Sequence, residues 1–559
     1  MPAKIPKVAE ASRLGFSEDQ RRDASATFSP APKGRNISAR GSAPGHHPIT
    51  NPSPEGAAEA LDHCKTGEEL LAAVLAKRER DHQGTGKYRQ PVEPAIDDLP
   101  HLPSHWTWAS PDQLSAASRN SMAIGPFGSN LKVPDYREEG VPLVFVRHVR
   151  AESFAETHYV TPEKAGELAA HAVVGGDLLI TKMGEPPGDS AIYPMGSPDA
   201  IITADCIKWR LAPAGLDPKF FNYALRSETT KRQIANRTRG VAQKKISLER
   251  FKDIALPLPA LPEQRRIVAR LEELFSRLEA GVAALRHAKT QLQRYRQSVL
   301  AAAVTGQLTQ AWREQHPDTE PAEELLKQAL SDARANWSGK RKFVEPAILN
   351  PEGLPELPST WTWTGVEQTG EVKLGRQRSP KQMTGDHIRP YLRVANVYED
   401  RIDTTDINEM NFTPDEFKIY ELKYGDILLN EGQSLEWVGR PAMYRDEIEG
   451  CCFQNTLVRY RAHYSVLPSY ALIVFRAYLH RGRFQKIAKW TNNIAHLGAG
   501  RFKEIEFPLP PLAEQHQIVA KVEARTTAID HLEAELARQI TRSNRLRQST
   551  LATAFQGNL

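Results

Sequence analysis

The chain has 559 residues, of which 40% are hydrophobic and 25% charged, values close to those of globular proteins that exclude a chain disordered throughout. Lys and Arg outnumber Asp and Glu by 73 to 68, and the net charge of +5 is compatible with nucleic-acid binding but too small to demonstrate it. At roughly 150 residues per domain, the length predicts two to four domains.

Three features of the sequence predict a cytoplasmic protein. No run of about 18 apolar residues is present that could form a membrane span. The start of the chain, Met1-Pro-Ala-Lys4, lacks the apolar core of a signal peptide. The four cysteines, Cys64, Cys206, Cys451 and Cys452, have no CxxC spacing, which predicts neither a disulfide framework nor a structural zinc site.

The elements predicted along the chain begin with an N-terminal extension that is rich in Pro, Ser, Gly and Ala and is expected to be disordered. In chain order the predicted segments are the disordered extension 1–65, a short helix and basic lead-in over 66–98, a globular domain over 99–253, a long helix over 254–308, a linker with a short helix over 309–353, a second globular domain over 354–504, and a second long helix over 505–559.

The chain contains an internal repeat, which has to be recognised before the fold can be predicted. The repeated stretches are Leu99–Trp108 with Leu354–Trp363, the sequence Val-Glu-Pro-Ala-Ile at 92–96 with 344–348, and 254–308, which aligns without gaps on 505–559. Two modules of similar length are therefore joined in tandem.

The interiors of the modules, 110–250 and 365–500, differ in sequence and share only a strand-like skeleton. Gly176-Asp-Leu-Leu-Ile180 corresponds to Gly425-Asp-Ile-Leu-Leu429, in each case a turn followed by a β-rich run. Short apolar strands alternate with helical patterns, which predicts a mixed α/β domain in each module and an α+β fold class for the whole chain.

Each module ends in a helix whose apolar residues alternate four and three positions apart, the pattern of a coiled-coil seam. The seam residues are Ile267, Leu271, Leu274, Leu278, Leu285, Leu292 and Val299 in the first helix, and Ile518, Val522, Ile529, Leu532, Leu536 and Leu546 in the second. Gly306 and Gly557 lie where a helix terminator is expected. We expect the two helices to pack on each other; the alternative is that each packs only on its own domain.

Two tandem copies are expected to pack about an approximate two-fold axis, which makes the two helices antiparallel. The two domains then lie at opposite ends of a helix pair about 60 Å long, comparable to one or two turns of B-DNA. Since the domains differ in sequence, this arrangement predicts a spacer between two different readers of a split, asymmetric DNA target.

This layout resembles the specificity subunit of type I restriction–modification systems over residues 66–559. The resemblance rests on the duplicated order of variable domain, long helix and terminal Gly-x-Leu, and on Pro-Leu-Pro-x-Leu-x-Glu-Gln-x-x-Ile-Val at 257–268, which recurs at 508–519. It implies two target recognition domains that each read half of a bipartite site, and an antiparallel coiled coil that fixes the spacer. The extension 1–65 departs from this pattern.

The resemblance also implies that the chain is a non-catalytic subunit that binds double-stranded DNA. Its partners would be two modification subunits, which methylate adenine with S-adenosylmethionine, and restriction subunits, which use ATP and Mg²⁺. No cofactor or metal is then expected on this chain itself.

The sequence holds few candidates for chemistry of its own. Asn51-Pro-Ser-Pro54 lacks the aromatic residue of an amino-methyltransferase motif, and Gly84-Thr-Gly-Lys87 lacks the upstream glycine and the hydroxyl of a phosphate loop. Asp415, Glu421 and Lys423 have the residue types of a metal-dependent nuclease, but the close spacing favours a charged surface turn.

Readers of base edges are expected among Arg, Lys, Asn and Gln on exposed loops. The candidates are Lys132, Arg147, His148, Lys182, Gln243, Lys244 and Lys245 in the first domain, and Arg376, Arg378, Lys381, Arg393, Asn396, Gln433, Arg440, Asn492 and Asn493 in the second. Lys244-Lys245 and Asn492-Asn493 are predicted to lie in corresponding loops before each long helix. By contrast, Trp106, Trp108, Trp361 and Trp363 belong to the shared frame and are expected to be core anchors.

Two other functions remain open at the level of sequence. One is a DNA-modifying or DNA-cleaving enzyme, a fused nuclease or methyltransferase. The other is a coiled-coil interaction protein without a DNA role, which the modest net charge leaves possible.

Overall fold

The computed structural model describes residues 64–82, 88–213, 215–239, 244–335, 342–380, 383–491 and 493–559. The predicted disordered extension lies outside the described residues, apart from Cys64 and Lys65. Among the helices that are described, none is long and apolar enough to cross a membrane.

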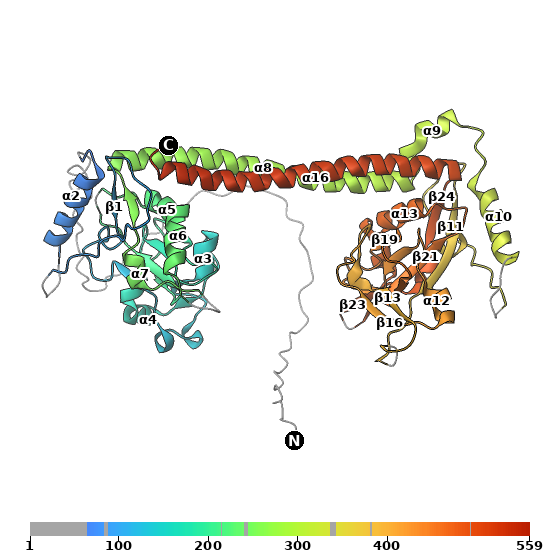
Figure 1. The fold of residues 1–559 in the computed structure, drawn as a ribbon, viewed down its shortest axis with the longest axis horizontal. Coiled ribbons are helices and arrows are strands. Elements are labelled where there is room, and N and C mark those ends of the chain that lie inside the picture. Colours follow the sequence, from blue (N-terminus) through green and yellow to red (C-terminus); the bar gives the residue numbers. More distant parts are fainter. Residues whose placement is uncertain are drawn as a thin grey trace, which may run out of the picture. The chain divides into compact units, whose positions relative to one another are not determined.

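The first module consists of a short N-terminal helix, a mixed domain and a long helix (Figure 1). Its elements are α2 Gly67–Arg80, β1 Thr107–Ala109, β2 Met122–Ile124, β3 Val141–Val144, α3 Val146–Ala151, β4 Tyr159–Val160, α4 Pro162–Glu167, β5 Ala172–Val173, β6 Leu178–Thr181, β7 Ser190–Ile192, β8 Ala200–Ile202, β9 Cys206–Trp209, α5 Pro218–Arg226, α6 Glu228–Arg237, α7 Leu248–Lys252, β10 Leu256–Leu258 and α8 Leu261–Val304.

The second module repeats this order after a connection that contains α9 and α10. Its elements are α9 Gln310–Gln315, α10 Ala322–Ala335, β11 Thr362–Gly365, α11 Val366–Thr369, β12 Gly370–Leu374, β13 Ile388–Leu392, β14 Val397–Tyr398, β15 Arg401–Ile402, β16 Asn408–Asn411, α12 Pro414–Tyr420, β17 Ile427–Asn430, β18 Gly432–Gln433, β19 Pro441–Met443, β20 Cys452–Phe453, β21 Leu457–Ala462, α13 Pro468–His480, α14 Arg483–Ile487, β22 Lys489–Thr491, β23 Ile494–His496, α15 Ala499–Lys503, β24 Glu506–Leu509 and α16 Leu512–Ala554.

The two domains share the topology of their central sheet although their sequences differ. The central sheet runs β2-β9-β6-β7 in the first domain and β12-β21-β17-β19 in the second, with antiparallel neighbours throughout. A second sheet contains one parallel pair in each domain, β3 with β8 and β13 with β20. The predicted tandem pair of mixed α/β domains is confirmed.

The Trp-Thr-Trp and Pro-Leu-Pro motifs pair with each other as a two-stranded sheet at the start of each long helix. In the first module Trp108 lies opposite Pro257, and in the second Trp363 lies opposite Pro508. Trp106 and Trp361 are only 5% and 6% exposed, so they serve as core anchors as expected, whereas Trp108 and Trp363 are half-buried.

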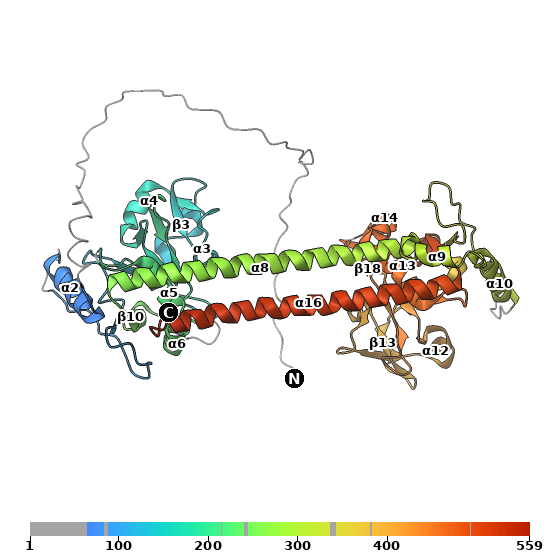
Figure 2. The ribbon, with the colours of Figure 1, turned by 90° about the horizontal axis from the view of Figure 1, so that it is seen from above.

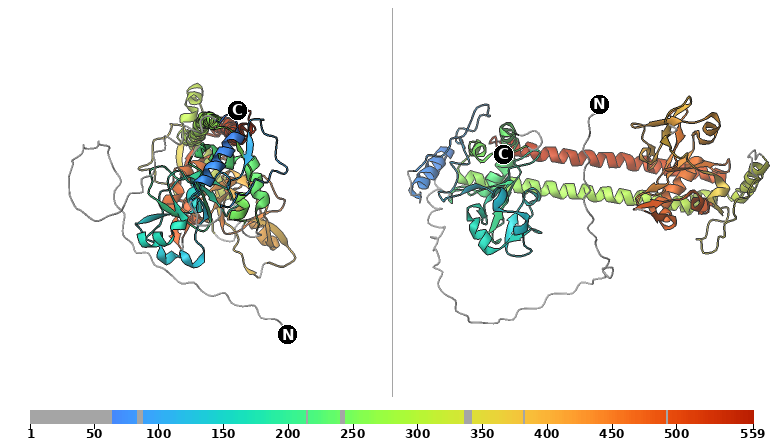
Figure 3. Two further views of the ribbon diagram at one scale, coloured as in Figure 1. Left: turned by 90° about the vertical axis from the view of Figure 1, so that its left-hand side faces the viewer. Right: turned by 90° about the horizontal axis from the view of Figure 1, so that it is seen from below.

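The two long helices run antiparallel and side by side, as Figures 1 and 2 both show. Arg296 of α8 bonds to Asp530 of α16 at 2.6 Å, while Glu279, nearer the start of α8, pairs with Arg547, nearer the end of α16, at 2.9 Å. The antiparallel direction is the one that the sequence predicted. The view from below in Figure 3 shows the same arrangement.

Each domain packs on both helices. The core of the first domain includes Ile267 and Leu271 from the start of α8, together with Leu551 and Phe555 from the end of α16. The core of the second domain includes Ile518 from the start of α16, together with residues from the end of α8 such as Leu300. Each helix therefore belongs to two cores, and the alternative in which each packs only on its own domain is wrong.

Candidate nucleic-acid interface

The Glu-Gln motif explains how each domain is held at the start of its own long helix. Gln264 and Gln515 are fully buried. The amide oxygen of Gln264 accepts a hydrogen bond from the backbone N–H of Asp217 at 3.0 Å, and that of Gln515 accepts one from Leu467 N–H at 2.8 Å. Because both side chains also donate to backbone carbonyls, every polar atom is satisfied and the domain is fixed on the helix.

A buried ion pair supports the central strand of each sheet. Asp177 and Asp426, 2% and 1% exposed, stand in the Gly-Asp motifs before β6 and β17. Arg210 donates two hydrogen bonds of 2.7 Å to Asp177, and Arg461 donates two of 2.6 Å to Asp426. Such forked pairs have a fixed geometry, so they hold the starts of β6 and β17 in the same way in both domains.

In the first domain, the loop after β6 and the segment around Lys245 bring basic residues together beyond the end of β6. Lys182 follows β6 directly, and its Nζ lies 4.4 Å from the ring centre of Phe127, which is 60% exposed. Met183 forms a β-bridge with Lys245, which also bridges Arg239. Burial lowers the pKa of Lys182, and the nearby positive charge of Lys245 lowers it further, against the attraction of Asp205.

The second domain builds a hairpin at the equivalent place. β18, which follows β17, pairs with β23, and β23 pairs with β22. All three residues of β22 are exposed, including Lys489 and Trp490, the latter to 56%. Asn493 lies in the turn between β22 and β23 with φ 63°. Lys244-Lys245 in the first domain and Asn493 in the second therefore lie in corresponding places, each beside the segment that follows β6 or β17, as predicted. Asn492 lies outside the described residues.

A second aromatic and basic cluster in this domain surrounds Tyr398, at the end of β14. The guanidinium carbons of Arg401 and Arg440 lie 4.6 and 4.7 Å from the Tyr398 ring centre. Arg440 also donates a 2.6 Å hydrogen bond to the carbonyl of Val397. Stacked guanidinium and aromatic groups at a domain surface have the chemistry that contacts phosphates and unstacked bases.

The predicted base readers do not all lie on exposed loops. Lys132, Arg147, Lys244, Lys245, Arg378 and Asn493 are exposed, and Lys182, Arg393, Gln433 and Arg440 are half-buried. Gln243, Lys381 and Asn492 lie outside the described residues. None of these positions is tested as a DNA contact, so as DNA contacts they stay predictions.

For His148, Arg376 and Asn396, the expectation of an exposed loop is wrong, because their side chains are 3%, 7% and 2% exposed. His148 Nδ1 accepts a hydrogen bond from the backbone N–H of Phe145. Arg376 is held by Glu416, and Asn396 donates to two backbone carbonyls of its own loop. Each of these side chains forms a hydrogen bond within the chain that holds a backbone segment in place.

Three exposed aromatic residues, Phe127, Tyr398 and Trp490, were missed by reasoning from the sequence. Each lies beside a basic residue, but Lys182 is far from Phe127 in the chain, and Arg440 is far from Tyr398. Lys489-Trp490 is adjacent in sequence, and Arg401 is only three residues from Tyr398, so these two local pairs could have been found as aromatic residues beside basic ones.

The predicted seam residues fall into three groups according to burial. Ile267, Leu271, Val299, Ile518, Val522 and Ile529 are buried, Leu274, Leu278, Leu285, Leu292 and Leu536 are half-buried, and Leu532 and Leu546 are exposed to 50% and 54%. The buried residues lie where a helix passes a domain, apart from Ile529. Residues 276–298 of α8 contain no buried side chain, so the middle of the pair leaves apolar surface uncovered.

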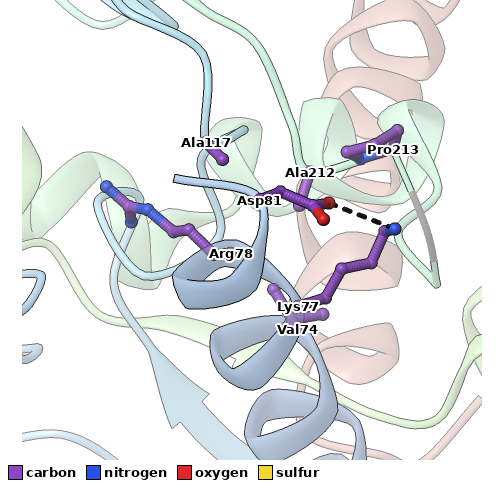
Figure 4. A pocket seen from close by; sticks show the side chains of 7 residues that line it. All are labelled: Val74, Lys77, Arg78, Asp81, Ala117, Ala212 and Pro213. Atoms are coloured by element: carbon purple, nitrogen blue, oxygen red, sulfur yellow. Dashed lines mark ion pairs between the residues drawn. The ribbon is translucent and has the colours of Figure 1, made fainter. Parts of the chain in front are cut away.

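The residue types that suggested a nuclease do not form a convergent site. Asp415 lies in the first turn of α12, its side chain is 93% exposed, and it bonds to Lys418. Within the described residues, no group of three or more His, Cys, Asp or Glu side chains is placed to hold a metal ion. The pocket beside α2 in Figure 4 has Lys77 and Asp81 at its edge, and these two charges pair with each other at 3.2 Å.

Comparisons with known proteins agree with this architecture. The family described as "Type I restriction modification DNA specificity domain" matches residues 161–284 and 361–542. The EcoKI specificity subunit of a type I restriction enzyme from Escherichia coli K12 is 26% identical over 342 residues, 61% of this chain. The chain spans 65% of the length of that protein.

The EcoBI specificity subunit from Escherichia coli is also 26% identical, over 84% of this chain and 89% of that protein. A solved structure described as showing complex assembly and conformational transition of the type I restriction–modification system superposes with a TM-score of 0.55 at 17% identity. The superposition covers 82% of this chain and all of that one, and it shows a shared fold.

Proposed function

Because this chain belongs to the family of type I restriction–modification specificity subunits, whose function is DNA sequence recognition, we propose that its two globular domains each read one half of a bipartite, asymmetric DNA site. The observation that carries the proposal is the contrast between the two domains. Their central sheets have one topology, but the segments around the loops beyond β6 and β17 carry different basic and aromatic side chains. Because these segments occupy equivalent positions but carry different side chains, the two half-sites differ in sequence.

The helix pair fixes the spacer between the half-sites. Each of α8 and α16 belongs to the cores of both domains, so neither domain can move along the pair without exposing apolar side chains. A helix of 44 residues is about 66 Å long, close to two turns of B-DNA. The two sets of loops can therefore meet stretches of groove that are separated along one DNA duplex.

The middle of the helix pair is the proposed docking surface for two modification subunits. Tyr295, Leu532 and Leu546 are exposed to 48%, 50% and 54%. Leu546 also lines an apolar groove of about 340 Å³, together with Leu274 and Leu278. Two packed helices leave this stripe half covered, and further helices from a partner would bury it.

In this proposal the chain supplies recognition and spacing, and its partners supply the chemistry. S-adenosylmethionine would bind to the modification subunits, and ATP with Mg²⁺ to the restriction subunits. Direct contacts of this chain with DNA would be mainly to phosphates through Lys and Arg, with fewer contacts to base edges.

A domain exchange tests the modular proposal. Residues 365–500 are replaced by the corresponding segment of a relative with a different target, and the chain is produced with its modification subunit. Sequencing of methylated adenines should show one altered half-site, with the other half and the spacer unchanged. A change in both halves would contradict independent reading by the two domains.

The matched control replaces residues 110–250 in the same way. It should alter only the other half-site. If the two exchanges altered the same half, the assignment of one half to each domain would be wrong.

A further inference from the structure

The sequence Val-Glu-Pro-Ala-Ile occurs at 92–96 and 344–348, and we call these two stretches the strap segments. They lie outside the helices and strands in both modules. Their large apolar side chains point to solvent: Val344 and Ile348 are 82% and 90% exposed, and Val92 and Ile96 are 37% and 55% exposed.

Packing within this chain does not explain why the strap segments are identical. A side chain that is mostly exposed, such as Val344 or Ile348, contributes little to folding, and substitutions there usually change stability little. The interiors of the two modules have meanwhile diverged, so that Lys182 follows β6 where Glu431 follows β17. Identity of five consecutive residues with exposed Val and Ile therefore indicates a common binding partner.

The backbone of the first strap segment is held in place, which distinguishes it from a loose linker. Val92 N–H donates to the carboxylate of Asp112 at 2.9 Å, and Ser110 donates its hydroxyl to the Val92 carbonyl. Ala95 N–H donates to the carbonyl of Asp253 at 2.9 Å. A segment whose backbone is fixed while its apolar side chains face solvent binds at a lower entropic cost than a flexible one.

The second strap segment also lies near the residue that corresponds to Ser110, although Ala347 approaches it and not Val344, the counterpart of Val92. The Ala347 carbonyl is 3.8 Å from the position of a Cβ on Gly365, and Gly365 lies where Ser110 lies in the first module, two residues after the second Trp of the repeated motif. Glu345 pairs with Arg334 of α10 at 3.2 Å.

Each strap segment leads into the Leu-Pro-x-Leu-Pro motif, which contacts the end of the helix from the other module. A Cβ on Gly557 would lie 2.2 Å from Cγ of Pro103, and a Cβ on Gly306 would lie 2.5 Å from Cγ of Pro358. Both strap segments therefore lead to the ends of the helix pair, whose middle is the surface proposed above to dock modification subunits.

The chemistry of the strap segments excludes DNA as their partner. Neither segment contains a Lys or Arg for a phosphate, and two identical segments cannot distinguish two different half-sites. A protein with an apolar cleft for Val and Ile fits instead. Since the chain has two equivalent segments, that protein is expected in two identical copies.

We propose that each strap segment is a docking site for one modification subunit, which takes the exposed Val and Ile into an apolar cleft. This rests on the proposed function, because it assumes that two modification subunits bind the chain. The strap segments would be attachment points in addition to the helix pair, with one in each module.

The test measures how many modification subunits the full-length chain binds. The variants are Val92→Asp with Ile96→Asp, Val344→Asp with Ile348→Asp, and all four together; Val133→Asp, at a residue 75% exposed in the first domain only, is the matched control. Native mass spectrometry with the modification subunit from the same host should give two copies for wild type and control, one for each two-residue variant, and none or at least tenfold weaker binding for the four-residue variant.

The outcomes separate the two proposals. Two tightly bound copies on the four-residue variant would overturn the docking role of the strap segments and leave the proposed function standing. Failure of the wild-type chain to bind any modification subunit would instead overturn the proposed function. If an Asp variant does not fold, as judged by its thermal melt, the same substitutions to Ala should still lower the affinity.

Discussion

Glu263 and Glu514 occupy the same position in the two copies of the Pro-Leu-Pro motif, yet their surroundings differ. Both accept a hydrogen bond from a Trp indole, Trp106 for Glu263 at 3.0 Å and Trp361 for Glu514 at 2.8 Å. Glu514 is fully buried and is also bonded by Thr309 and by Arg313, which follow α8. It therefore ties the start of α16 to the chain that leaves α8.

This difference predicts unequal losses of stability from one substitution. Glu514→Ala leaves the Arg313 guanidinium without its buried partner and should cost about 3–5 kcal/mol. Glu263→Ala should cost about 1 kcal/mol, because its ionic partners His105 and Arg266 are about half exposed. Calorimetric melting of the two variants measures the difference, and equal shifts in melting temperature would contradict it.

The long helices end at glycines, and the structure shows a reason beyond helix termination. Gly306 and Gly557 have φ of 74° and 79°, the left-handed conformation that follows many helices. Each also lies against a proline of the opposite module, Pro358 or Pro103, at a distance that leaves no room for a Cβ. The helix end and the frame of the other module are therefore in direct contact.

Two glycine substitutions in this helix pair should have opposite signs. Gly557→Ala should destabilise the chain by roughly 1–3 kcal/mol or more, because it adds a left-handed alanine and a clash with Pro103. Gly281→Ala, in the middle of α8 where a Cβ would meet no atom within 4 Å, should stabilise it by about 0.5–1 kcal/mol.

Thermal melts of the two variants measured side by side test this expectation. The Gly281→Ala variant is the control for the effect of Ala on the unfolded chain. A melting temperature for Gly557→Ala at or above that of the wild type would contradict the contact with Pro103.

For the molecule as a whole, the spacing between the two domains depends on the length of the helix pair. Ion pairs between Glu279 and Arg547, and between Arg296 and Asp530, place Ala288 opposite Arg538 by their common register. Neither stretch between these ion pairs contains a buried residue, so the pair can be lengthened there without disturbing either core.

A matched insertion of seven helical residues after Ala288 and after Arg538 should lengthen the pair by about 10 Å, close to three base-pair rises. Both half-sites should be kept while the preferred spacer becomes longer, with some loss of affinity because the DNA must also twist. Methylation of a library of sites with randomised spacers measures the preference.

The control for this experiment carries the insertion in α16 alone. It puts the two helices out of register and should lower the melting temperature. An unchanged spacer preference in the matched variant would remove the mechanical role of the helix pair.

The sequence by itself determined the repeat, the two mixed domains and the antiparallel helix pair, because these depend on local patterns that occur in both modules. The Pro-Leu-Pro and Trp-Thr-Trp motifs located the shared frame, and the seam residues located the helices. The duplicated Gly-Asp motifs marked the equivalent strands β6 and β17. Periodicity and repetition are properties of the chain itself, so they can be found without a structure.

Only the tertiary structure decided which polar side chains face solvent. His148, Arg376 and Asn396 have the residue types of base readers but are buried and hydrogen-bonded within the chain, while Lys182 meets Phe127 and Arg440 meets Tyr398 from distant parts of the sequence. The exposure of the strap segments could not be predicted from the sequence either, since Val and Ile are residue types that are most often buried. Burial and long-range contact depend on how segments from different parts of the chain come together, and no local pattern specifies that.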